Sequence, residues 1–459
     1  MKLTTVTMLK LTYSDYLKFL FFVFTVFLFS CKEEVKVQEK PNIVLIFVDD
    51  MGYGDLGCYG HPLIKTPHID KMADEGIRLT SFYAAAPVCS PSRAALLTGR
   101  YPIRHLPTNL GPSKENGLPL YEVTIADILK EQGYKTKAIG KWHLGHRKQF
   151  LPTSRGFDSF YGLPYSNDLI LPWCPWLNEN HILELYVDES PVKEVGFDQD
   201  NFTVNYTQKA VEFITESKDQ PFFLYLAHSM PHLPISTSDE FKGKSAAGLY
   251  GDIVQTLDWS VGEVLKTLKE QDLDKNTLVI FTSDNGPWNN LPERMLQKGV
   301  KPWHGGSAGL LNGSKATTYE GGFRVPAIAR WPMNIPENQV SAKMATTMDL
   351  FATIAEISGA SLPTDREIDG NNILQFLKGE ESSSPTNNFF YLSRTTVEAY
   401  RQEEWKLRIT KSKGVELFNL STDPGEKYNQ ANDYPELVKE LYGEMEIFSQ
   451  KTNAKLNPM

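Results

Sequence analysis

Short apolar runs alternate with amphipathic helical patterns along most of the chain. The strand-like runs are rich in Val, Ile, Leu and Phe: Asn42–Val48, Tyr134–Ile139, Phe222–Ala227, Thr277–Thr282 and Val325–Ala329. The helical patterns lie between or after them: Thr66–Asp74, Thr124–Gln132, Asn201–Glu216, Gly251–Glu270 and Met348–Ile357. Strands that are apolar on both faces are typical of a sheet covered by helices on both sides. The pattern therefore predicts an α/β fold.

The pattern changes after Gly379, where a polar segment, Glu380–Asn388, reads as a linker. Shorter elements follow it: strand-like runs at Phe389–Leu392, Trp405–Ile409 and Val415–Phe418, and a final helix at Pro435–Ser449. We therefore expect residues 41–379 to form the main domain. Residues 380–459 are expected to form a small C-terminal subdomain with an antiparallel sheet.

The N-terminus has the pattern of an export signal. Lysines precede the apolar run Phe19–Phe29, which is too short to span a membrane as a helix. The run ends in Leu28-Phe29-Ser30-Cys31, which resembles a bacterial lipoprotein cleavage box with Cys31 as the lipidated residue. We expect residues 1–30 to be a lipoprotein-type signal peptide and 31–40 a tether. The protein is then exported, either to the outer membrane or cell surface through the lipid on Cys31 or, with a plain secretory signal, to the periplasm.

Composition excludes some classes of partner. The chain of 459 residues has a net charge of −9, with 41% apolar and 22% charged residues, which is ordinary for a soluble globular protein. Nucleic acid is therefore not an expected partner, and an anionic substrate must be held by a local cationic pocket. Cys58 and Cys174 can form a disulfide in an exported protein, but two free thiols fit the sequence equally well.

Polar side chains follow four of the predicted strands at the point where each strand ends. They are Asp49-Asp50, Lys141-Trp142-His143, His228 to His232, and Asp284-Asn285. In open α/β sheets, ligands bind outside the carboxyl ends of the strands. A single Asp after a strand is most often a turn residue, but four such endings together favour a shared site.

A fifth segment, Pro87-Val-Cys-Ser-Pro-Ser-Arg-Ala-Ala-Leu-Leu-Thr-Gly-Arg-Tyr101, predicts a helix capped by Ser90, with Pro91 at its first position and Gly99 at its end. Cys89 would then lie at the positive end of the helix, where a nucleophile is activated. The segment resembles the signature of the formylglycine-dependent sulfatases. In that family the cysteine is oxidised to an aldehyde (formylglycine, or 3-oxoalanine), whose hydrate attacks the sulfate ester. The resemblance implies that Cys89 is the precursor of the catalytic group.

The resemblance extends from Pro41 to the C-terminus, and Gly140–Phe150 is similar to the arylsulfatase A and N-acetylgalactosamine-6-sulfatase branch. It implies an alkaline-phosphatase-like large mixed sheet flanked by helices, with a small C-terminal antiparallel sheet. It also implies a sulfated oligo- or polysaccharide substrate and, as a partner, a formylglycine-generating or sulfatase-maturing enzyme.

The candidate metal ligands are Asp49, Asp50, Asp284 and Asn285, which offer only oxygen atoms. Oxygen donors favour a hard divalent cation over zinc. These positions match the metal-binding pattern of the sulfatases, in which the modified Cys89 completes the shell. The resemblance therefore implies Ca²⁺, with Mg²⁺ as the alternative.

Arg93, Lys141 and Lys315 are the candidate cations for the sulfate, because fixed positive charges stabilise a transferring anionic group. Ser166 matches a serine that lies near the sulfate in some relatives.

His143 and His232 are the candidate proton carriers, because histidine titrates near neutral pH. Carried over from the family, His143 removes a proton in the step that releases sulfate. His232 contacts the sulfate and assists the leaving alcohol together with Lys315, and Asp284 accepts the proton of the attacking hydrate. For His228 and His146 we expect structural roles.

Substrate choice is expected in the loops at 167–200 and 287–313, where aromatic side chains can stack on sugars: Trp173, Trp176, His181, Trp288, Trp303 and His304. Arg104 and His105 are further candidates for contact with an anionic neighbouring sugar.

Two other functions remain open from the sequence. One is a phosphate mono- or diester hydrolase of the same superfamily, although Lys141 and Lys315 stand where such enzymes bind a second metal. The other is a non-catalytic glycan-binding surface lipoprotein, which failure to convert Cys89 would produce.

Overall fold

The computed structural model describes residues 12–14, 40–112, 115–177, 181–194, 199–297 and 299–459. Apart from residues 12–14 and 40, the expected signal peptide, tether and lipidation site at Cys31 lie outside the described residues. The chain from Pro41 to Met459 forms one compact unit. Within the described part of the chain, no helix is both long and apolar enough to cross a membrane.

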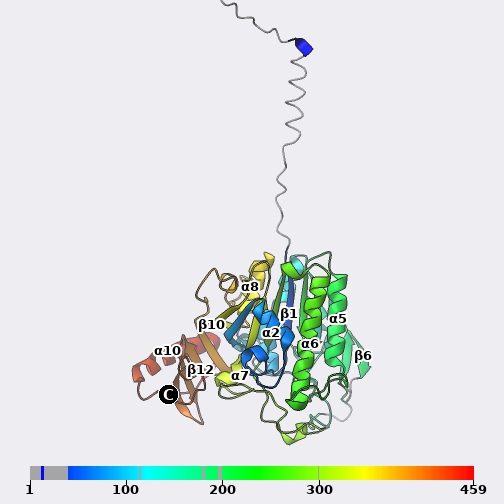
Figure 1. Cartoon of the computed structure of the whole chain (residues 1–459). Coiled ribbons are helices and arrows are strands. Elements are labelled where there is room, and N and C mark those ends of the chain that lie inside the picture. Colours follow the sequence, from blue (N-terminus) through cyan, green and yellow to red (C-terminus); the bar gives the residue numbers. More distant parts are fainter. Residues whose placement is uncertain (1–11, 15–39, 113–114, 178–180, 195–198, 298) are drawn as a thin grey trace, which may run out of the picture. The chain divides into compact units, whose positions relative to one another are not determined.

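A ten-stranded mixed sheet forms the centre of this unit, in the order β10-β2-β9-β8-β1-β7-β3-β4-β5-β6 (Figure 1). The strands are β1 (Asn42–Val48), β2 (Ile77–Tyr83), β3 (Lys135–Lys141), β4 (Ser159–Leu163), β5 (Glu184–Val187), β6 (Ser190–Glu194), β7 (Phe222–Ala227), β8 (Thr277–Ser283), β9 (Arg324–Arg330) and β10 (Gln339–Thr346). The central strands β8, β1, β7, β3 and β4 run parallel. Strand β9 runs antiparallel to both of its neighbours, which makes the sheet mixed.

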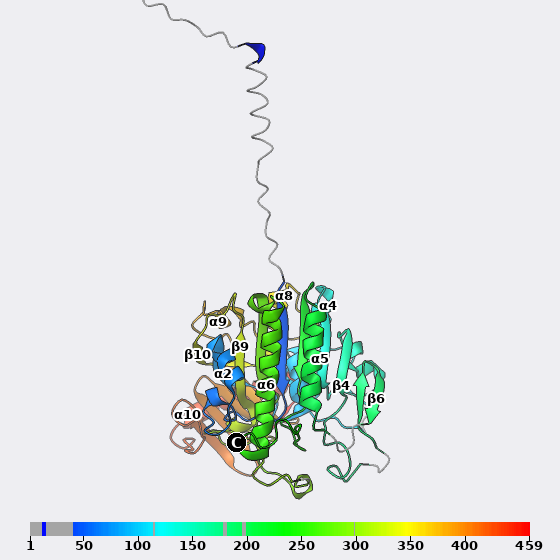
Figure 2. The ribbon, with the colours of Figure 1, turned by 45° about the vertical axis from the view of Figure 1, so that its right-hand side comes forward.

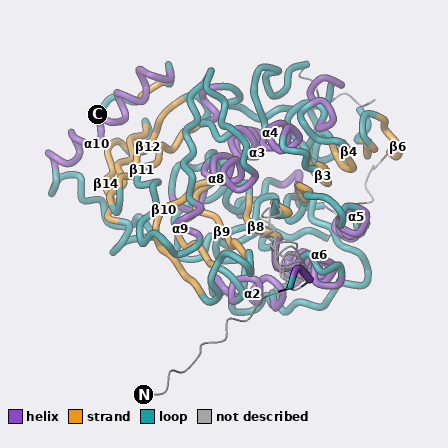
Figure 3. Tube along the Cα trace, turned by 90° about the horizontal axis from the view of Figure 1, so that it is seen from above, coloured by secondary structure: helices purple, strands orange, loops and turns teal. Residues whose placement is uncertain are grey.

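Helices cover both faces of the large sheet, as the apolar strands predict. On one face lie α3 (Cys89–Thr98), α4 (Ile125–Glu131), α8 (Asp349–Ser358) and α9 (Leu374–Leu377). On the other lie α2 (Pro67–Asp74), α5 (Phe202–Glu216) and α6 (Gly248–Glu270) (Figures 2 and 3). Strand β1 serves both cores: Ile43, Leu45 and Phe47 pack into the first, and the residues between them into the second.

The C-terminal part forms a second sheet. Strands β11 (Asn388–Ser393), β12 (Thr396–Gln402), β13 (Trp405–Thr410) and β14 (Gly414–Asn419) are antiparallel, and β15 (Lys455–Leu456) pairs parallel with β12. Helix α10 (Pro435–Thr452) packs on this sheet, and α7 (Glu320–Phe323) lies beside it. Single-turn 3-10 helices lie in connections: Gly57–Tyr59, Pro102–Arg104, Lys148–Phe150, Pro152–Ser154, Asp274–Asn276 and Glu293–Met295.

A buried polar network joins the two sheets. Glu320, from α7, accepts hydrogen bonds from Tyr83 of β2 (2.6 Å) and Tyr391 of β11 (2.7 Å). Lys406 of β13 forms ion pairs with Glu320 (3.0 Å) and Glu426 (2.8 Å), and all three charged side chains are fully buried. The C-terminal sheet is therefore fixed to the loop that leads out of the Lys315 segment.

The expected large mixed sheet and small antiparallel sheet are confirmed, but some strands were missed. Strand β2 mixes apolar residues with Arg78, Thr80 and Ser81, and β6 is exposed along its whole length. Their apolar signal is too weak to reveal them. Both Cys58 and Cys174 are free thiols.

Candidate active site

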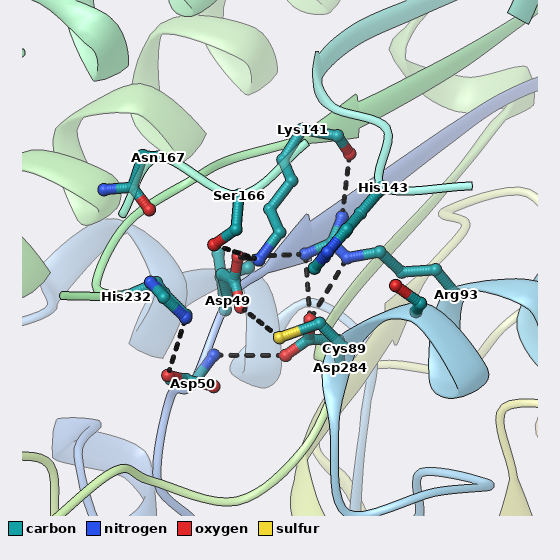
Figure 4. A network of polar contacts seen from close by, with 12 residues as sticks. Asp49, Asp50, Cys89, Arg93, Lys141, His143, Ser166, Asn167, His232 and Asp284 are labelled. Carbon is teal, nitrogen blue, oxygen red and sulfur yellow. Dashed lines mark hydrogen bonds and ion pairs between the residues drawn. The ribbon is translucent and has the colours of Figure 1, made fainter. Parts of the chain in front are cut away.

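The carboxyl ends of β1, β3, β7 and β8 meet at one edge of the large sheet, because these strands are adjacent and parallel. The side chains that follow them converge with the start of α3 (Figure 4). The converging side chains form a cluster whose residues are fully or almost fully buried: Asp49, Asp50, Cys89, Arg93, Lys141, His143, Ser166, His232, Asp284 and Asn285. Lys315 approaches from the loop before α7, with 11% of its side chain exposed. The structure thus brings together all the residues predicted for catalysis and metal binding.

The turn after β1 positions two of the carboxylates. Asp50 has φ = 63°, a left-handed conformation that is uncommon for a residue other than glycine and costs on the order of 1–3 kcal/mol. Its backbone N–H donates to Asp284 Oδ1 at 3.1 Å, and the next N–H donates to Ser283 Oγ at 3.0 Å. The ends of β1 and β8 are therefore tied directly to each other.

Side-chain oxygen atoms from the ends of β1 and β8 lie close together at this hydrogen-bonded junction. Asn285 donates through Nδ2 to Asp50 Oδ1 at 2.7 Å, and its own Oδ1 is buried and has no hydrogen-bond partner among the described residues. Ligand-capable atoms of Asp49, Asp50, Cys89 and His232 lie within 4.8 Å of one another. A buried acceptor without a donor is costly in a folded protein, and a cation would satisfy it. The residues present fit a hard divalent ion.

Three cationic side chains contact the carboxylates of Asp49, Asp50 and Asp284. Arg93 donates through Nε and Nη2 to Asp284 Oδ2 at 3.2 and 2.9 Å. Lys141 forms an ion pair with Asp49 and donates to Ser166 Oγ at 3.1 Å. Lys315 donates to Asp50 Oδ2 at 2.7 Å. The cluster is therefore close to electrically balanced, which lowers the cost of burying so many charges.

The charges shift the pKa values of these aspartates in opposite directions. Burial acts to raise the pKa of Asp49, but the neighbouring Lys141, His232 and Arg93 outweigh it and hold this pKa well below its ordinary value. Burial and then the charge of Asp49 raise the pKa of Asp284 to about 7, against the effect of Arg93. In the absence of a cation, the site therefore favours an ionised Asp49 beside a less acidic Asp284.

Cys89 begins helix α3, and Val88 occupies the N-cap position. The expectation that Ser90 caps the helix is wrong: its Oγ accepts from Leu110 N at 3.1 Å, and its N–H donates to Asn109 Oδ1 at 3.0 Å. The Cys89 sulfur lies 3.4 Å from Asp49 Oδ1 and 3.5 Å from Lys315 Nζ.

The surroundings of Cys89 favour a neutral thiol in the unmodified chain. Burial and then the charge of Asp49 raise its pKa well above the ordinary value, and these effects outweigh Lys141 and Lys315. A neutral, buried sulfur at this position is poorly suited to act as a nucleophile without modification.

The two histidines differ in what they contact. His143, at φ = 59°, places Nε2 at 3.0 Å from the Leu110 carbonyl oxygen, so this nitrogen carries the donated proton. Its Nδ1 is buried and has no hydrogen-bond partner among the described residues. Burial, with Lys141 and Arg93, holds the His143 pKa well below its ordinary value. His143 is therefore neutral near pH 7, with a lone pair available on Nδ1.

His232 donates through Nδ1 to the Leu233 carbonyl at 2.5 Å and places Nε2 at 3.6 Å from Asp50 Oδ2. Its pKa is also held well below the ordinary value, by burial and then by Lys315. His228 instead contacts Ser260 Oγ at 3.1 Å, and His146 packs on the Tyr165 ring, so both have the structural roles expected of them.

Among the loop aromatics, Trp288 contacts the site. Its ring centroid lies 4.8 Å from Lys315 Nζ and 5.6 Å from the His232 ring. The sequence placed it in a substrate loop without distinguishing it from its neighbours. Trp173 is buried in the second core, so it offers no free ring face.

Arg104 and His105 do not reach the site. They follow the ten-residue helix α3, whose first residue is Cys89, so roughly 15 Å of helix separates them from it. Arg104 is paired with Asp369 at 2.7 Å, and His105 contacts Thr98. The hypothesis that they bind a neighbouring sugar is wrong.

Comparisons with known proteins agree with this geometry. The Sulfatase family model matches residues 41–360, and a model for the C-terminal part of N-sulphoglucosamine sulphohydrolase matches residues 312–451. The chain is 41% identical over 410 residues to N-acetylgalactosamine-6-sulfatase of Mus musculus, covering 84% of this chain and 76% of that protein. It is 37% identical over 457 residues to arylsulfatase A of Homo sapiens, covering 88% and 87%.

Solved structures give the same result. Ps i-CgsB in complex with k-i-k-neocarrahexaose aligns with a TM-score of 0.77 and 32% identity, over 90% of this chain and 93% of that one. The PsFucS1 sulfatase from Pseudoalteromonas sp. aligns with a TM-score of 0.80 and 30% identity, over 90% and 91%. The expected alkaline-phosphatase-like fold is confirmed. The matches span both sheets and every residue of the buried cluster, and the chain therefore belongs to the sulfatase family and is a sulfatase enzyme.

Proposed function

We propose that this sulfatase releases inorganic sulfate from a sulfated carbohydrate through a formylglycine formed from Cys89. The observation that carries the proposal is the position of the Cys89 sulfur. It lies between an aspartate and a lysine, at 3.4 Å from Asp49 Oδ1 and 3.5 Å from Lys315 Nζ. A formylglycine-generating or sulfatase-maturing enzyme would oxidise Cys89 before the site closes, because the folded chain leaves the side chain only 1% exposed.

Asp49, Asp50, Asp284 and Asn285 are the residues that would hold Ca²⁺, or Mg²⁺ in its place, together with the modified residue 89. When bound, the cation would polarise a sulfate oxygen and make the hydrate more acidic. Support comes from the oxygen-only donor set and from the buried Asn285 Oδ1, which no residue in the described part of the chain hydrogen-bonds.

The remaining residues act on charge and protons. Lys141 and Lys315, released from their aspartates, would face the sulfate oxygens, with Ser166 Oγ donating beside Lys141. Arg93 would stay with Asp284 and keep this carboxylate in place. Fixed donors of this kind stabilise charge that develops in the transition state without reorganising.

His143 is suited to the proton transfer that regenerates the aldehyde. Its Nε2–H is committed to the Leu110 carbonyl, which leaves Nδ1 as the proton acceptor. His232, next to Lys315 and Trp288, would assist the leaving alcohol only in its doubly protonated form, because the neutral ring carries its one proton on Nδ1, which is donated to Leu233. Burial and Lys315 lower the His232 pKa, so the negative charge of a bound sulfate would have to favour protonation of Nε2. Asp284, held by the Asp50 N–H and by Arg93, is the carboxylate that would accept the proton of the attacking hydroxyl.

A sulfated glycan is the substrate class we favour. The relatives include N-acetylgalactosamine-6-sulfatase, and one similar structure holds k-i-k-neocarrahexaose. Trp288 beside Lys315 offers an aromatic face for a sugar ring. Export, with a lipid on Cys31 at the outer membrane or cell surface, remains part of this proposal and rests on the N-terminal sequence alone.

The test is inorganic sulfate release from a panel of sulfated mono-, oligo- and polysaccharides by protein co-expressed with a maturation enzyme. The matched control is Cys89→Ala, which removes the sulfur but keeps the helix start. We expect release by the first protein and none by the second. Release of phosphate from phosphoesters at a comparable rate, with no sulfate release, would instead favour the phosphoester hydrolase.

A further inference from the structure

A cavity of about 840 Å³ adjoins the active-site segment on the side of the C-terminal sheet. Pro87 and Val88, which lead into Cys89, form one wall, and Ala316, which follows Lys315, forms another. These walls are fixed to each other, because Ala316 N donates to the Pro87 carbonyl at 2.9 Å. The cavity therefore begins one residue away from both the nucleophile position and a cation of the site. Its volume lies within the range of natural ligand pockets.

The opposite wall comes from the C-terminal sheet. Arg394 and Thr395 form the two-residue turn between β11 and β12, and Lys455 lies on β15, which pairs with β12 through Thr396. Lys455 N donates to the Thr395 carbonyl at 2.7 Å. The β11–β12 turn and strand β15, which are distant in sequence, thus contribute two exposed cationic residues to the lining of the same cavity.

The charge of this cavity is one-sided. Its described lining contains Arg394 and Lys455 but no carboxylate, and the other polar groups are hydroxyls and an amide. Neither cationic side chain forms an ion pair with a residue that the structure describes, whereas 28 ion pairs link other described residues. The protein as a whole carries a net charge of −9. Two exposed cations that line one cavity, with no carboxylate in its described lining, form a local site for an anion.

Arg394 is also held in an unfavourable backbone conformation. Its φ is 55°, in the left-handed region that turns of this kind normally fill with Gly or Asn. A non-glycine residue there costs about 1 kcal/mol or more. Strained residues of this type concentrate at functional sites, and a glycine would relieve the strain and remove the guanidinium.

We infer that this cavity is a subsite for an anionic group, a carboxylate or a sulfate, on the sugar next to the one that carries the scissile ester. Arg394 and Lys455 bind that group, and the hydroxyls of the wall receive the hydroxyls of the sugar. The inference rests on the proposed function and extends it from sulfated carbohydrates to those with a second anionic group on a neighbouring sugar.

Equilibrium binding of defined oligosaccharides to Cys89→Ala protein tests this. One probe is a chondroitin 6-sulfate tetrasaccharide, which carries carboxylates and sulfates on alternate sugars. The other is a κ-carrageenan tetrasaccharide, whose anionic groups are all sulfates. Each is titrated into three proteins that share Cys89→Ala: the parent, Arg394→Gly/Lys455→Gln, and Lys411→Gln/Lys413→Gln. The last pair removes the same charge from exposed positions at the β13–β14 turn, outside the cavity.

We expect the parent and the Lys411/Lys413 control to bind at least one probe equally well. Arg394→Gly/Lys455→Gln should bind that probe about tenfold more weakly, which corresponds to about 1.4 kcal/mol. Its affinity should also depend less on NaCl concentration, since fewer charge contacts remain to be screened. Loss for the chondroitin probe alone identifies a carboxylate, and loss for the carrageenan probe identifies a sulfate.

Equal affinities in the parent and in Arg394→Gly/Lys455→Gln, an equal loss in the control pair, or no binding of either probe would overturn the inference. Thermal unfolding of each variant checks the fold, and the glycine at position 394 should not lower the midpoint. The readout needs no turnover. A protein that binds as expected but releases no sulfate would therefore reject the proposed function and leave the subsite standing.

Discussion

Replacing Lys406 by methionine should destabilise the junction between the large sheet and the C-terminal sheet. Lys406 is fully buried, and its ammonium group lies 3.0 Å from Glu320 and 2.8 Å from Glu426, both buried. Its Nζ also lies 3.9 Å from the centre of the Tyr391 ring. Methionine fills a similar volume but leaves two carboxylates without their shared cation.

The expected loss of unfolding free energy depends on the groups that still contact the two carboxylates after Lys406 is replaced. Removing one partner of a buried ion pair typically costs about 3–5 kcal/mol, because the remaining charge is uncompensated. Glu320 keeps the hydroxyls of Tyr83 and Tyr391 as donors, and Glu426 keeps the Glu320 N–H at 2.7 Å. We therefore expect a loss near the lower end, ~3 kcal/mol. For a unit of this size the unfolding entropy is on the order of 0.9 kcal/mol/K, so the midpoint should fall by roughly 3–4 °C.

Differential scanning calorimetry at pH 7.5 measures this change. Glu320 keeps Arg324 at 3.6 Å, so Glu426 is the carboxylate that loses its cation in Lys406→Met. The matched control is Lys406→Met/Glu426→Gln, in which the group at position 426 becomes neutral and still accepts the Glu320 N–H. It should regain part of the lost stability. A midpoint within 1 °C of the wild-type value in Lys406→Met, or no recovery in the double variant, would refute the electrostatic reasoning.

Three further predictions concern pH, charge and metal. Burial raises the Glu426 pKa to about 7 from an ordinary 4.5, so the proton on Glu426 stabilises the fold below pH 4.5 and this contribution is lost as the pH rises through 7. Glu426→Gln should therefore flatten the decline of the unfolding midpoint between pH 5 and 7.5. An unchanged slope of midpoint against pH would contradict this. Lys315→Met should lower kcat/KM for sulfate release by about 10²–10³, as expected for loss of one preorganised donor. The control Lys301→Met, at an exposed loop position, should leave kcat/KM unaltered. Equal effects of the two substitutions would count against a role for Lys315. Dialysis against EDTA should lower both sulfate release and the unfolding midpoint, because Asp49, Asp50 and Asp284 lose a shared cation. Addition of Ca²⁺ should then restore both. Insensitivity to EDTA and Ca²⁺ would argue against a metal at these residues.

The core of the fold was predictable because its strands are apolar on both faces. Asn42–Val48 was placed correctly to the residue, and it serves two cores. Strand β10, by contrast, is exposed over most of its first half, and β15 has only two residues. Such elements are stabilised by pairing with neighbours that are distant in sequence, and their own composition does not reveal them.

The buried cluster was predictable for a related reason. Asp49 and Asp284 directly follow a strand, Lys141 is the last residue of β3, and His232 lies five residues after β7. Adjacent parallel strands bring such positions to one edge. The pairing of Lys141 with Asp49 or of Lys315 with Asp50 has no signal in the sequence, because it depends on side-chain positions after folding. The same holds for Arg394 and Lys455, which only the pairing of β12 with β15 places together.

The state of residue 89 provides the most direct test of the account. Preparations matured to different extents can be compared by the mass of the peptide that contains position 89 and by the rate of sulfate release from one active substrate. The account predicts that the rate per molecule rises in proportion to the fraction of Cys89 converted to formylglycine and is absent from unconverted protein. Sulfate release by fully unconverted protein, or a silent protein with position 89 fully converted, would contradict it.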